Sequence, residues 1–389
     1  MKRVPGMKHR VVILTEIIAP YRTPVFNALA VHEGVDLHVV FLSETDATQR
    51  QWRVHKEDIR FSYEVLPSWR RRVAEHNILL NRGLGRSLRK ISPHVIVCGG
   101  YNYPASWQAL YWARRHHVPF VLWSESTARD QRGGYVPTEF LKKYFLGRCD
   151  GFVVPGKTSF DYLLSLGEAA STILLAPDAV DNAFFARASA AARRDEVGHR
   201  KKLGLPDRFF LYVGRLITEK GVFDLLDAYS RLEPELRSTV GLVFVGDGKV
   251  RTALQGRAST VNPGSVHFAG FAQREELAVY YALAEAFVFP THSDPWGLVV
   301  NEAMACGLPI VISSVAGCAA DLVVEGWNGY VLPAHDIGGL ARAMESLALN
   351  PDLRNRMGHN STRRIQSYSP ELCASGLAKV TTLVGMGPA

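Results

Sequence analysis

The sequence predicts an α/β protein of two successive doubly wound parallel sheets. Strand-length apolar runs alternate with helical patterns along most of the chain, which is typical of parallel βαβ units. A polar stretch rich in Ala and Arg, at 187–202, interrupts this alternation, and a second series follows it. The length of 389 residues also favours two domains, at about 100–200 residues per domain. We therefore expect a boundary between 180 and 200.

The first series contains six expected strands and four expected helices. The strands are short runs rich in β-branched or aromatic residues, at 10–14, 37–41, 95–98, 120–123, 152–154 and 173–175. The helices have apolar residues at helical spacing, at 23–31, 106–116, 138–146 and 158–166.

The second series repeats this plan. Strands are expected at 209–214, 240–245, 286–290 and 309–312, and helices at 221–232, 249–258, 274–284 and 298–305. Ligands of doubly wound sheets bind at the carboxyl ends of the strands, so we expect the site in the crevice between the two units.

Composition excludes several classes of protein. Apolar residues make up 47% and charged residues 21%, as in ordinary globular chains. The five cysteines form no C-x-x-C pair, which argues against a disulfide framework or a zinc ribbon and favours reduced thiols in a cytoplasmic protein. The uncharged stretches 92–113 and 303–320 contain turn residues and are interpreted as buried strand and helix units, not membrane spans.

The basic charge is unevenly distributed. The net charge of +8 lies entirely in residues 1–190, whereas residues 191–389 are neutral overall. Arg and Lys clusters with interleaved aromatic residues occur at 69–72, 107–117 and 142–144. This half is expected to favour an anionic partner such as a lipid surface, although such clusters are commonly just solvated. No nucleic-acid-binding signature is present, so no nucleic-acid partner is expected.

A first candidate site follows the expected strand 209–214. Gly214 ends the strand, Arg215 follows it, and Lys220 is expected to open a helix with Gly221. Two cations beside a helix N-terminus suit a diphosphate, because the dipole and the N–H groups add to their charges. The alternative is a surface Arg and a solvated Lys.

A second candidate site precedes the expected helix 298–305. Asp294 lies in the strand-to-helix turn and Glu302 lies just over one turn inside the helix, so both can face one cavity. Carboxylates accept hydrogen bonds from vicinal hydroxyls, as ribose and sugars present them. The alternative is that Asp294 caps the turn and Glu302 pairs with a nearby cation.

Together these motifs resemble the large retaining GT-B glycosyltransferase group known as family 4. The resemblance covers about residues 205–335. It also includes the run Glu-Ala-Met-Ala-Cys-Gly-Leu-Pro at 302–309, the segment from Gly317 through Asp321 to Gly329, and Gly246-Asp247-Gly248. One departure is Asp294, where the family usually has Glu.

The resemblance implies a GT-B architecture of two facing Rossmann-like domains with an inter-domain cleft. Residues 1–186 would bind the acceptor and residues 187–365 the nucleotide-sugar donor. The segment 366–389 is expected to cross back to the first domain.

The resemblance also implies roles for the donor-site residues. Arg215 and Lys220 would neutralise the diphosphate, Glu302 would bind the ribose, and Asp294 would contact the transferred sugar. The rest of the expected donor site is Gly214, Asp247, Gly270, Trp296, Gly297, Leu298 and Val299.

Four residues of the first half are candidates for the acceptor side or the cleft. Arg22 lies in a Pro-Tyr-Arg-x-Pro loop that resembles one found in part of the group, with helix capping as the alternative. Glu125 and Arg129 follow the strand 120–123, and Asn102 follows the strand 95–98. A solvated loop acid is the alternative for Glu125.

We therefore expect a retaining, metal-independent hexosyltransferase. It would move a sugar from a UDP- or GDP-sugar to a hydroxyl of a glycan or lipid-linked acceptor, in polysaccharide or glycoconjugate biosynthesis. No cofactor and no metal are expected, since no carboxylate cluster has metal-ligand spacing. The expected location is the cytoplasm, with peripheral contact to the inner face of the membrane. The alternatives are a non-catalytic nucleotide-sugar-binding protein and a nucleotide-sugar epimerase on a related fold.

Overall fold

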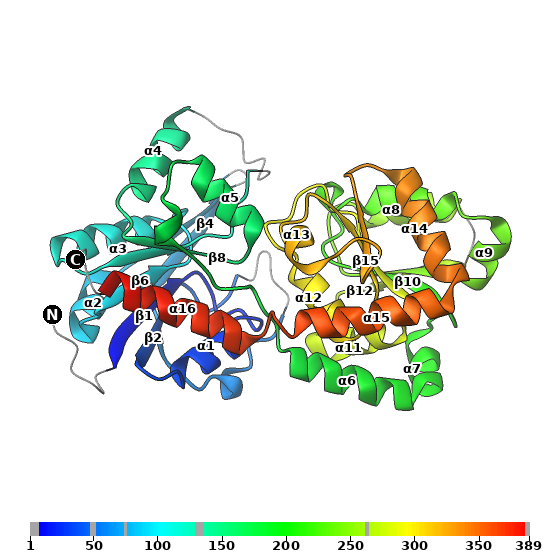
Figure 1. Cartoon of the computed structure of the whole chain (residues 1–389), viewed down its shortest axis with the longest axis horizontal. Coiled ribbons are helices and arrows are strands. Elements are labelled where there is room, and N and C mark those ends of the chain that lie inside the picture. The colour runs from blue at the N-terminus through cyan, green and yellow to red at the C-terminus, as the bar shows by residue number, and fades with distance from the viewer. Residues whose placement is uncertain (1–7, 47–51, 74–75, 129–135, 261–263, 386–389) are drawn as a thin grey trace. The chain divides into compact units, whose positions relative to one another are not determined.

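The computed structural model describes residues 8–46, 52–73, 76–128, 136–260 and 264–385, and it divides into two compact units (Figure 1). The first unit holds the described residues up to Ala179 and takes up the chain again from Pro370. The second unit holds residues Val180–Ser369. Each unit contains one parallel sheet, so the prediction of two doubly wound α/β domains is confirmed.

The first unit contains a seven-stranded sheet in the order β3-β2-β1-β6-β7-β8-β9. All neighbouring strands of this sheet are parallel. The strands are β1 (His9–Thr15), β2 (Val35–Phe41), β3 (Ser62–Val65), β6 (Val95–Cys98), β7 (Phe120–Trp123), β8 (Gly151–Val154) and β9 (Ile173–Leu175). A separate antiparallel hairpin joins β4 (Ser68–Val73) to β5 (His76–Asn81).

Helices cover both faces of the first sheet. They are α1 (Thr23–Ala30), α2 (Leu84–Ile91), α3 (Pro104–Arg115), α4 (Val136–Leu146), α5 (Lys157–Ser165) and α16 (Pro370–Gly385). Successive β1 residues point to opposite faces. Val11 packs in one core with Phe26 of α1 and Leu377 of α16, and Val12 packs in another with Leu110 of α3. In Figure 1 the last helix, α16, accordingly lies beside α1, the first.

The second unit contains a six-stranded parallel sheet in the order β12-β11-β10-β13-β14-β15. The strands are β10 (Phe209–Val213), β11 (Gly241–Val245), β12 (Val266–Gly270), β13 (Ala286–Phe289), β14 (Ile310–Ser313) and β15 (Gly329–Leu332). The chain runs outward from β10 through β11 and β12, then returns to β13 on the other side of β10. The strand order therefore reverses between β10 and β13, which is where open α/β sheets bind their ligands.

The second unit also contains ten α-helices among its described residues. They are α6 (Asn182–Arg194), α7 (Glu196–Leu203), α8 (Val222–Ser230), α9 (Pro234–Thr239), α10 (Arg251–Ala258), α11 (Arg274–Leu283), α12 (Leu298–Ala305), α13 (Ala319–Leu322), α14 (Ile337–Leu349) and α15 (Pro351–Ile365).

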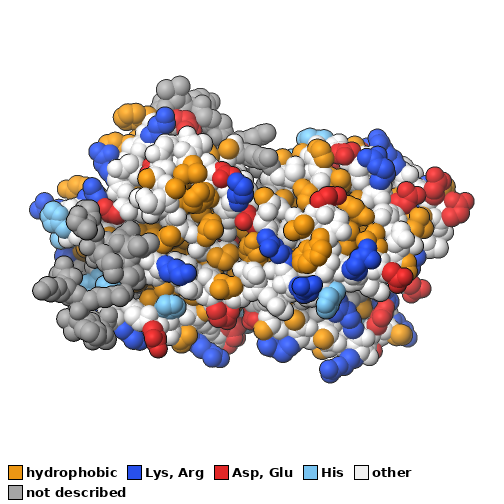
Figure 2. Space-filling view, in the orientation of Figure 1, with side chains coloured by type: hydrophobic (Ala, Val, Ile, Leu, Met, Phe, Trp, Pro, Cys, Tyr) orange, Lys and Arg blue, Asp and Glu red, His pale blue; other side chains and the backbone are white. Residues whose placement is uncertain are grey.

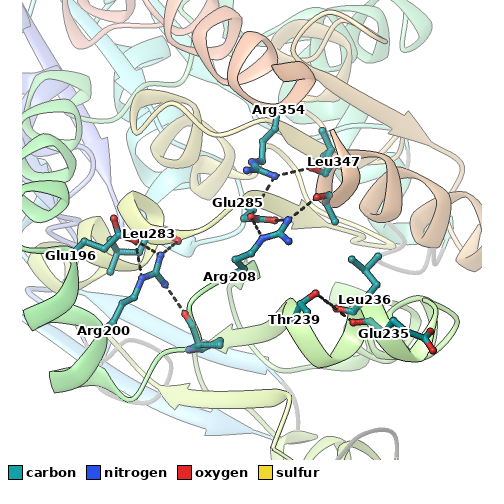
Figure 3. A network of polar contacts seen from close by, with 12 residues as sticks. Glu196, Arg200, Arg208, Glu235, Leu236, Thr239, Leu283, Glu285, Leu347 and Arg354 are labelled. Atoms are coloured by element: carbon teal, nitrogen blue, oxygen red, sulfur yellow. Dashed lines mark hydrogen bonds and ion pairs between the residues drawn. The ribbon is translucent and has the colours of Figure 1, made fainter. Parts of the chain in front are cut away.

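Two arginine clusters join helices and strands of the second unit (Figure 3). Arg208 donates to Glu285 at 2.6 Å and to the Ala348 carbonyl at 2.6 Å, and Arg354 lies 3.4 Å from the same carboxylate. Arg200 bonds to Glu196 one turn earlier and to carbonyls further along the chain. These contacts tie α7, α14 and α15 to the segments that precede β10 and β13.

The structure shows helices where the sequence indicated an interruption. The polar stretch 187–202 lies in α6 and α7. Phe185 of α6 packs against Tyr281 of α11 with ring centroids 6.1 Å apart, so α6 belongs to the second unit. The unit boundary consequently falls at residue 180, a few residues before the expected start at 187.

None of the described helices is long and apolar enough to cross a membrane. The uncharged stretch 92–113 contains β6 and most of α3, and the stretch 303–320 contains β14 between two helices.

Candidate functional site

Two glycine loops form the floor of the site at the carboxyl ends of β10 and β11. The Gly214 N–H donates to the Val245 carbonyl at 3.0 Å, and the Leu216 N–H donates to the Asp247 carbonyl at 2.9 Å. A Cβ atom on Gly246 would lie 1.9 Å from the Gly214 carbonyl oxygen. Only glycine fits there, so the two loops run against each other backbone to backbone.

Gly270 extends this floor to the end of β12. Its carbonyl accepts the Gly246 N–H at 2.7 Å, and its φ of +78° favours glycine. Asp247 is exposed on the floor, where its carboxylate accepts the Gly248 N–H at 2.8 Å and lies 3.6 Å from Arg251. The structure thus brings the expected Gly214, Asp247 and Gly270 together.

Arg215 presents its side chain to solvent at this edge of the sheet. Its backbone is held, because its carbonyl accepts the buried Tyr212 hydroxyl at 3.0 Å. Its side chain is exposed and makes no ion pair within the described part of the chain. The guanidinium is therefore available for a ligand anion.

Lys220 is buried, contrary to the alternative of a solvated lysine. Its ammonium donates to the Asp294 carboxylate at 2.6 Å and to the Ser293 carbonyl at 2.8 Å. Only 8% of Lys220 is exposed, so its charge is balanced mainly by Asp294.

The prediction that Lys220 opens a helix is wrong. Lys220 ends a 3₁₀ turn, Thr218–Lys220, and α8 begins at Val222. The reason lies at Gly221, whose φ is +66° and whose Cβ would lie 2.0 Å from the Pro290 carbonyl oxygen. The turn is pressed against the end of β13, and this contact directs Lys220 toward Asp294.

Asp294 is fixed from three sides. Besides Lys220, its carboxylate accepts the Trp296 N–H at 3.1 Å, and its carbonyl accepts the Gly317 N–H at 2.9 Å. A Cβ on Gly317 would lie 1.7 Å from the Pro295 carbonyl oxygen, so this loop also needs glycine. Asp294 therefore does cap its own turn, and it binds a lysine as well.

The residues between the two acids form the start of α12. The Trp296 indole is buried and donates to Asn301 at 3.0 Å, so it holds the loop from inside the core. Gly297, with φ of +99°, precedes the helix, and Leu298 and Val299 are partly exposed on its first turn. The loop shape thus depends on Trp296 and Gly297 more than on exposed side chains.

Glu302 lies one turn inside α12, as the sequence predicts, and it binds a tyrosine. The Tyr281 hydroxyl of α11 donates to the Glu302 carboxylate at 2.8 Å. Burial raises the pKa of Glu302 to about 7, although Tyr281 and Arg274 oppose the shift. The carboxyl is therefore close to half-protonated at neutral pH, and it can accept or donate a hydrogen bond. Tyr281 had no sequence signal of its own.

A second cluster lies in the first unit, around Arg22. Its guanidinium bonds to Asp178 at 3.0 Å, contacts the Glu125 carboxylate and lies over the Trp123 ring, 4.1 Å from its centroid. Burial raises the pKa of Asp178, and the Arg22 charge opposes that shift. The structure thus brings Arg22 and Glu125 together, and it adds Asp178, an acid that follows β9.

The two remaining candidates of the first half do not join this cluster. Asn102 is exposed in the loop after β6. Arg129 lies outside the described residues.

In sequence, the chain matches one family model and two curated relatives described here. Residues 195–364, all in the second unit, match the family described as Glycosyl transferases group 1. Glycogen synthase of Mycobacterium tuberculosis is 28% identical over 294 residues, which cover 73% of this chain and 68% of that protein. D-inositol 3-phosphate glycosyltransferase of Streptomyces coelicolor is 34% identical over 194 residues, covering 47% of this chain and 42% of that protein.

Among solved structures, Anabaena HepE in complex with UDP is similar with a TM-score of 0.76 and 15% identity, over 97% of this chain and 100% of that chain. This likeness shows the GT-B fold of two parallel-sheet α/β domains. Taken together, the sequence comparisons support the prediction that this chain is a hexosyltransferase.

The shifted pKa of Glu302 predicts a pH-dependent stability. Its pKa rises from the ordinary 4.5 to about 7 on folding, so between these values the unfolded state binds fewer protons. Stability should fall as pH rises from 5 to 8, by up to about 3 kcal/mol. Glu302→Gln should abolish that part of the fall, measured as Tm against pH.

The matched control is Glu233→Gln, which changes an exposed acid just before α9. Its Tm should follow that of the parent protein at every pH. Parallel Tm curves for the parent and Glu302→Gln would contradict the raised pKa.

Proposed function

We propose that this enzyme is a retaining glycosyltransferase of the family 4 kind that takes its sugar from a UDP- or GDP-sugar. Its acceptor would be a hydroxyl of a glycan or lipid-linked molecule in polysaccharide or glycoconjugate biosynthesis. The observation that carries the proposal is the placement of two features at the strand ends where the sheet order reverses between β10 and β13. These are the exposed side chain of Arg215 and the Lys220–Asp294 ion pair. The UDP complex of the structurally similar HepE supports the choice of donor class.

Arg215 would bind the diphosphate of the donor. Negative charge builds on the leaving diphosphate as the anomeric bond loosens, and a preorganised cation stabilises that charge. A guanidinium can bind two phosphate oxygens at once. Lys220, whose charge Asp294 largely balances, would contribute by holding that acid in place beside the diphosphate. This division of roles needs no metal ion.

The two acids would bind hydroxyl groups. Asp294 already accepts from Lys220 and Trp296, so its remaining lone pairs can accept from the transferred sugar. Glu302 would bind the ribose with the oxygen that Tyr281 leaves unused. Neither acid is assigned as a nucleophile, and a phosphate oxygen of the leaving group would take the acceptor's proton.

The Arg22 cluster of the first unit is the proposed acceptor-side element. Glu125 is the most exposed member, with 36% of its side chain accessible, and it can accept from acceptor hydroxyls. The Arg22 guanidinium contacts both acids. Asp178 would fix the position of Arg22, and Arg22 would in turn hold Glu125 in place.

A panel of UDP-, GDP-, ADP- and dTDP-sugars, each with and without EDTA, tests the donor proposal by thermal shift. One nucleotide class should raise Tm, since a ligand at 100 times its Kd adds about 2.7 kcal/mol of stability. EDTA should leave the shift unchanged, and a donor whose shift EDTA abolishes and Mg²⁺ or Mn²⁺ restores would contradict metal independence.

The same panel separates the alternatives when product formation is followed. A binding protein would show the shift without transfer or hydrolysis. An epimerase would consume the donor with no acceptor present. No shift with any nucleotide sugar would contradict the proposed donor site.

We further propose peripheral contact of the first unit with an anionic membrane surface. Aromatic side chains are exposed on α3 and on α4: Tyr111 is 71% exposed, Phe140 69% and Tyr144 43%. Tyr144 stacks on Trp107, one helical turn before Tyr111, so the two helices present one aromatic surface. Exposed cations, Arg115 on α3 and Lys143 on α4, accompany it.

Two of the basic residues singled out in the sequence do not take part. Arg70 is held by Glu16 and Asp46, and Lys142 is buried against Tyr162. On the face drawn in Figure 2, the Lys and Arg side chains of the described residues lie as separate groups among apolar and acidic ones. The proposal therefore depends on the aromatic surface of α3 and α4, with the cations as a supplement.

Vesicle sedimentation tests this contact. The protein should bind phosphatidylglycerol-containing vesicles more tightly than phosphatidylcholine vesicles, at about 1 kcal/mol per well-placed cation. Phe140→Ser should weaken binding about tenfold or more, because a buried Phe contributes about 1.5–3 kcal/mol. Val197→Ser, which changes an exposed apolar residue of α7, is the control. Equal binding to both lipids would contradict the proposal.

A further inference from the structure

We propose that Asp224, His292 and His335 form a binding site for Zn²⁺ or a similar divalent transition metal in the second unit. The three residues come from separate elements: α8, the loop after β13, and the loop between β15 and α14. The three residues are far apart in the sequence, so they form no recognisable metal-binding motif along the chain. The fold brings them together. The inference does not depend on the proposed transferase activity.

The ligand atoms are already close to the spacing that a zinc ion requires. His292 Nε2 lies 2.8 Å and His335 Nδ1 lies 3.1 Å from the same Asp224 oxygen, Oδ2, and all three ligand atoms lie within 4.8 Å of one another. Tetrahedral ligands at 2.0–2.1 Å from zinc are separated by about 3.3 Å. The two distances to Asp224 are thus within about 0.5 Å of that separation, and the two histidine nitrogens lie no more than 4.8 Å apart, so a small rearrangement of the three side chains would admit an ion.

The chemistry of the set suits such an ion. Two imidazole nitrogens and one carboxylate oxygen are typical zinc ligands, and a water molecule would complete a tetrahedron. The two imidazole rings lie next to each other, with their centroids 3.9 Å apart. One ion could therefore bind a nitrogen of each ring.

The surroundings leave access and space for the ion. The His335 side chain is 66% exposed, whereas those of His292 and Asp224 are 21% and 16% exposed. The site is therefore open to solvent on one side and enclosed on the other. A Cβ on Gly221 would lie 3.2 Å from His292 Nε2, so glycine at this position keeps the inner side uncrowded.

A metal ion here would brace the loops beneath the candidate donor site. His292 lies two residues before Asp294, and its N–H donates to the Glu219 carbonyl at 2.9 Å. Glu219 belongs to the turn that carries Lys220. The ion would therefore join the start of α8 and the β13 loop beside the Lys220–Asp294 pair, in a structural role.

Calorimetric titration of the full chain with Zn²⁺, after EDTA treatment and removal of the chelator, tests this site without any nucleotide. We expect one site that His292→Gln and His335→Asn each weaken at least tenfold. Asn suits position 335 because φ there is +65°, a conformation that Asn tolerates. Co²⁺ should give the intense visible absorption of a tetrahedral site in the parent protein and lose it in both variants.

Two control variants test other surface histidines. His359→Ala in α15 and His116→Ala, just after α3, should leave Zn²⁺ affinity unchanged. Absence of saturable binding at millimolar Zn²⁺ would overturn the proposal, and so would binding that survives both His292→Gln and His335→Asn. Either result would leave the three residues as a hydrogen-bonded cluster only. Circular dichroism of each variant establishes that it is folded.

Discussion

The candidate donor site depends on one ion pair, between buried Lys220 and partly exposed Asp294. A buried ammonium costs several kcal/mol unless a counter-charge and hydrogen bonds compensate it, and here a carboxylate at 2.6 Å and a carbonyl at 2.8 Å do so. The two residues follow β10 and β13, the strands between which the sheet order reverses. The pair therefore fixes the two sides of the ligand-binding edge relative to each other.

Close backbone packing at three glycines also fixes the loops around the ion pair. At Gly221, Gly246 and Gly317 a Cβ atom would lie 2.0 Å or less from a carbonyl oxygen of a neighbouring loop. These contacts bring the strand-end loops close together and leave the Arg215 side chain projecting into solvent. A rigid floor with an exposed cation is what electrostatic stabilisation of a leaving diphosphate requires. The Asp at 294, where longer Glu is usual in the resembled group, is here the partner of Lys220.

The sequence predicted the central strands well, because buried parallel strands are continuous apolar runs. Periodicity did not reveal α6 and α7, because the polar, charged residues of 187–202 indicated an interruption of the strand and helix pattern. Nor could spacing reveal partners: Tyr281 meets Glu302, and Asp178 meets Arg22, through contacts between distant elements. Such pairings depend on how the helices and loops pack, which no local pattern encodes.

Arg215 is proposed to bind the donor diphosphate at the sheet edge that holds the Lys220–Asp294 pair. The most direct test is kcat/KM of Arg215→Ala with the donor that the protein binds, compared with Arg356→Ala, which removes an exposed arginine of α15. We expect kcat/KM of Arg215→Ala to fall by a factor of about 10²–10³ while its Tm stays unchanged. Arg356→Ala should keep the parental kcat/KM. Equal activity in both variants would contradict it.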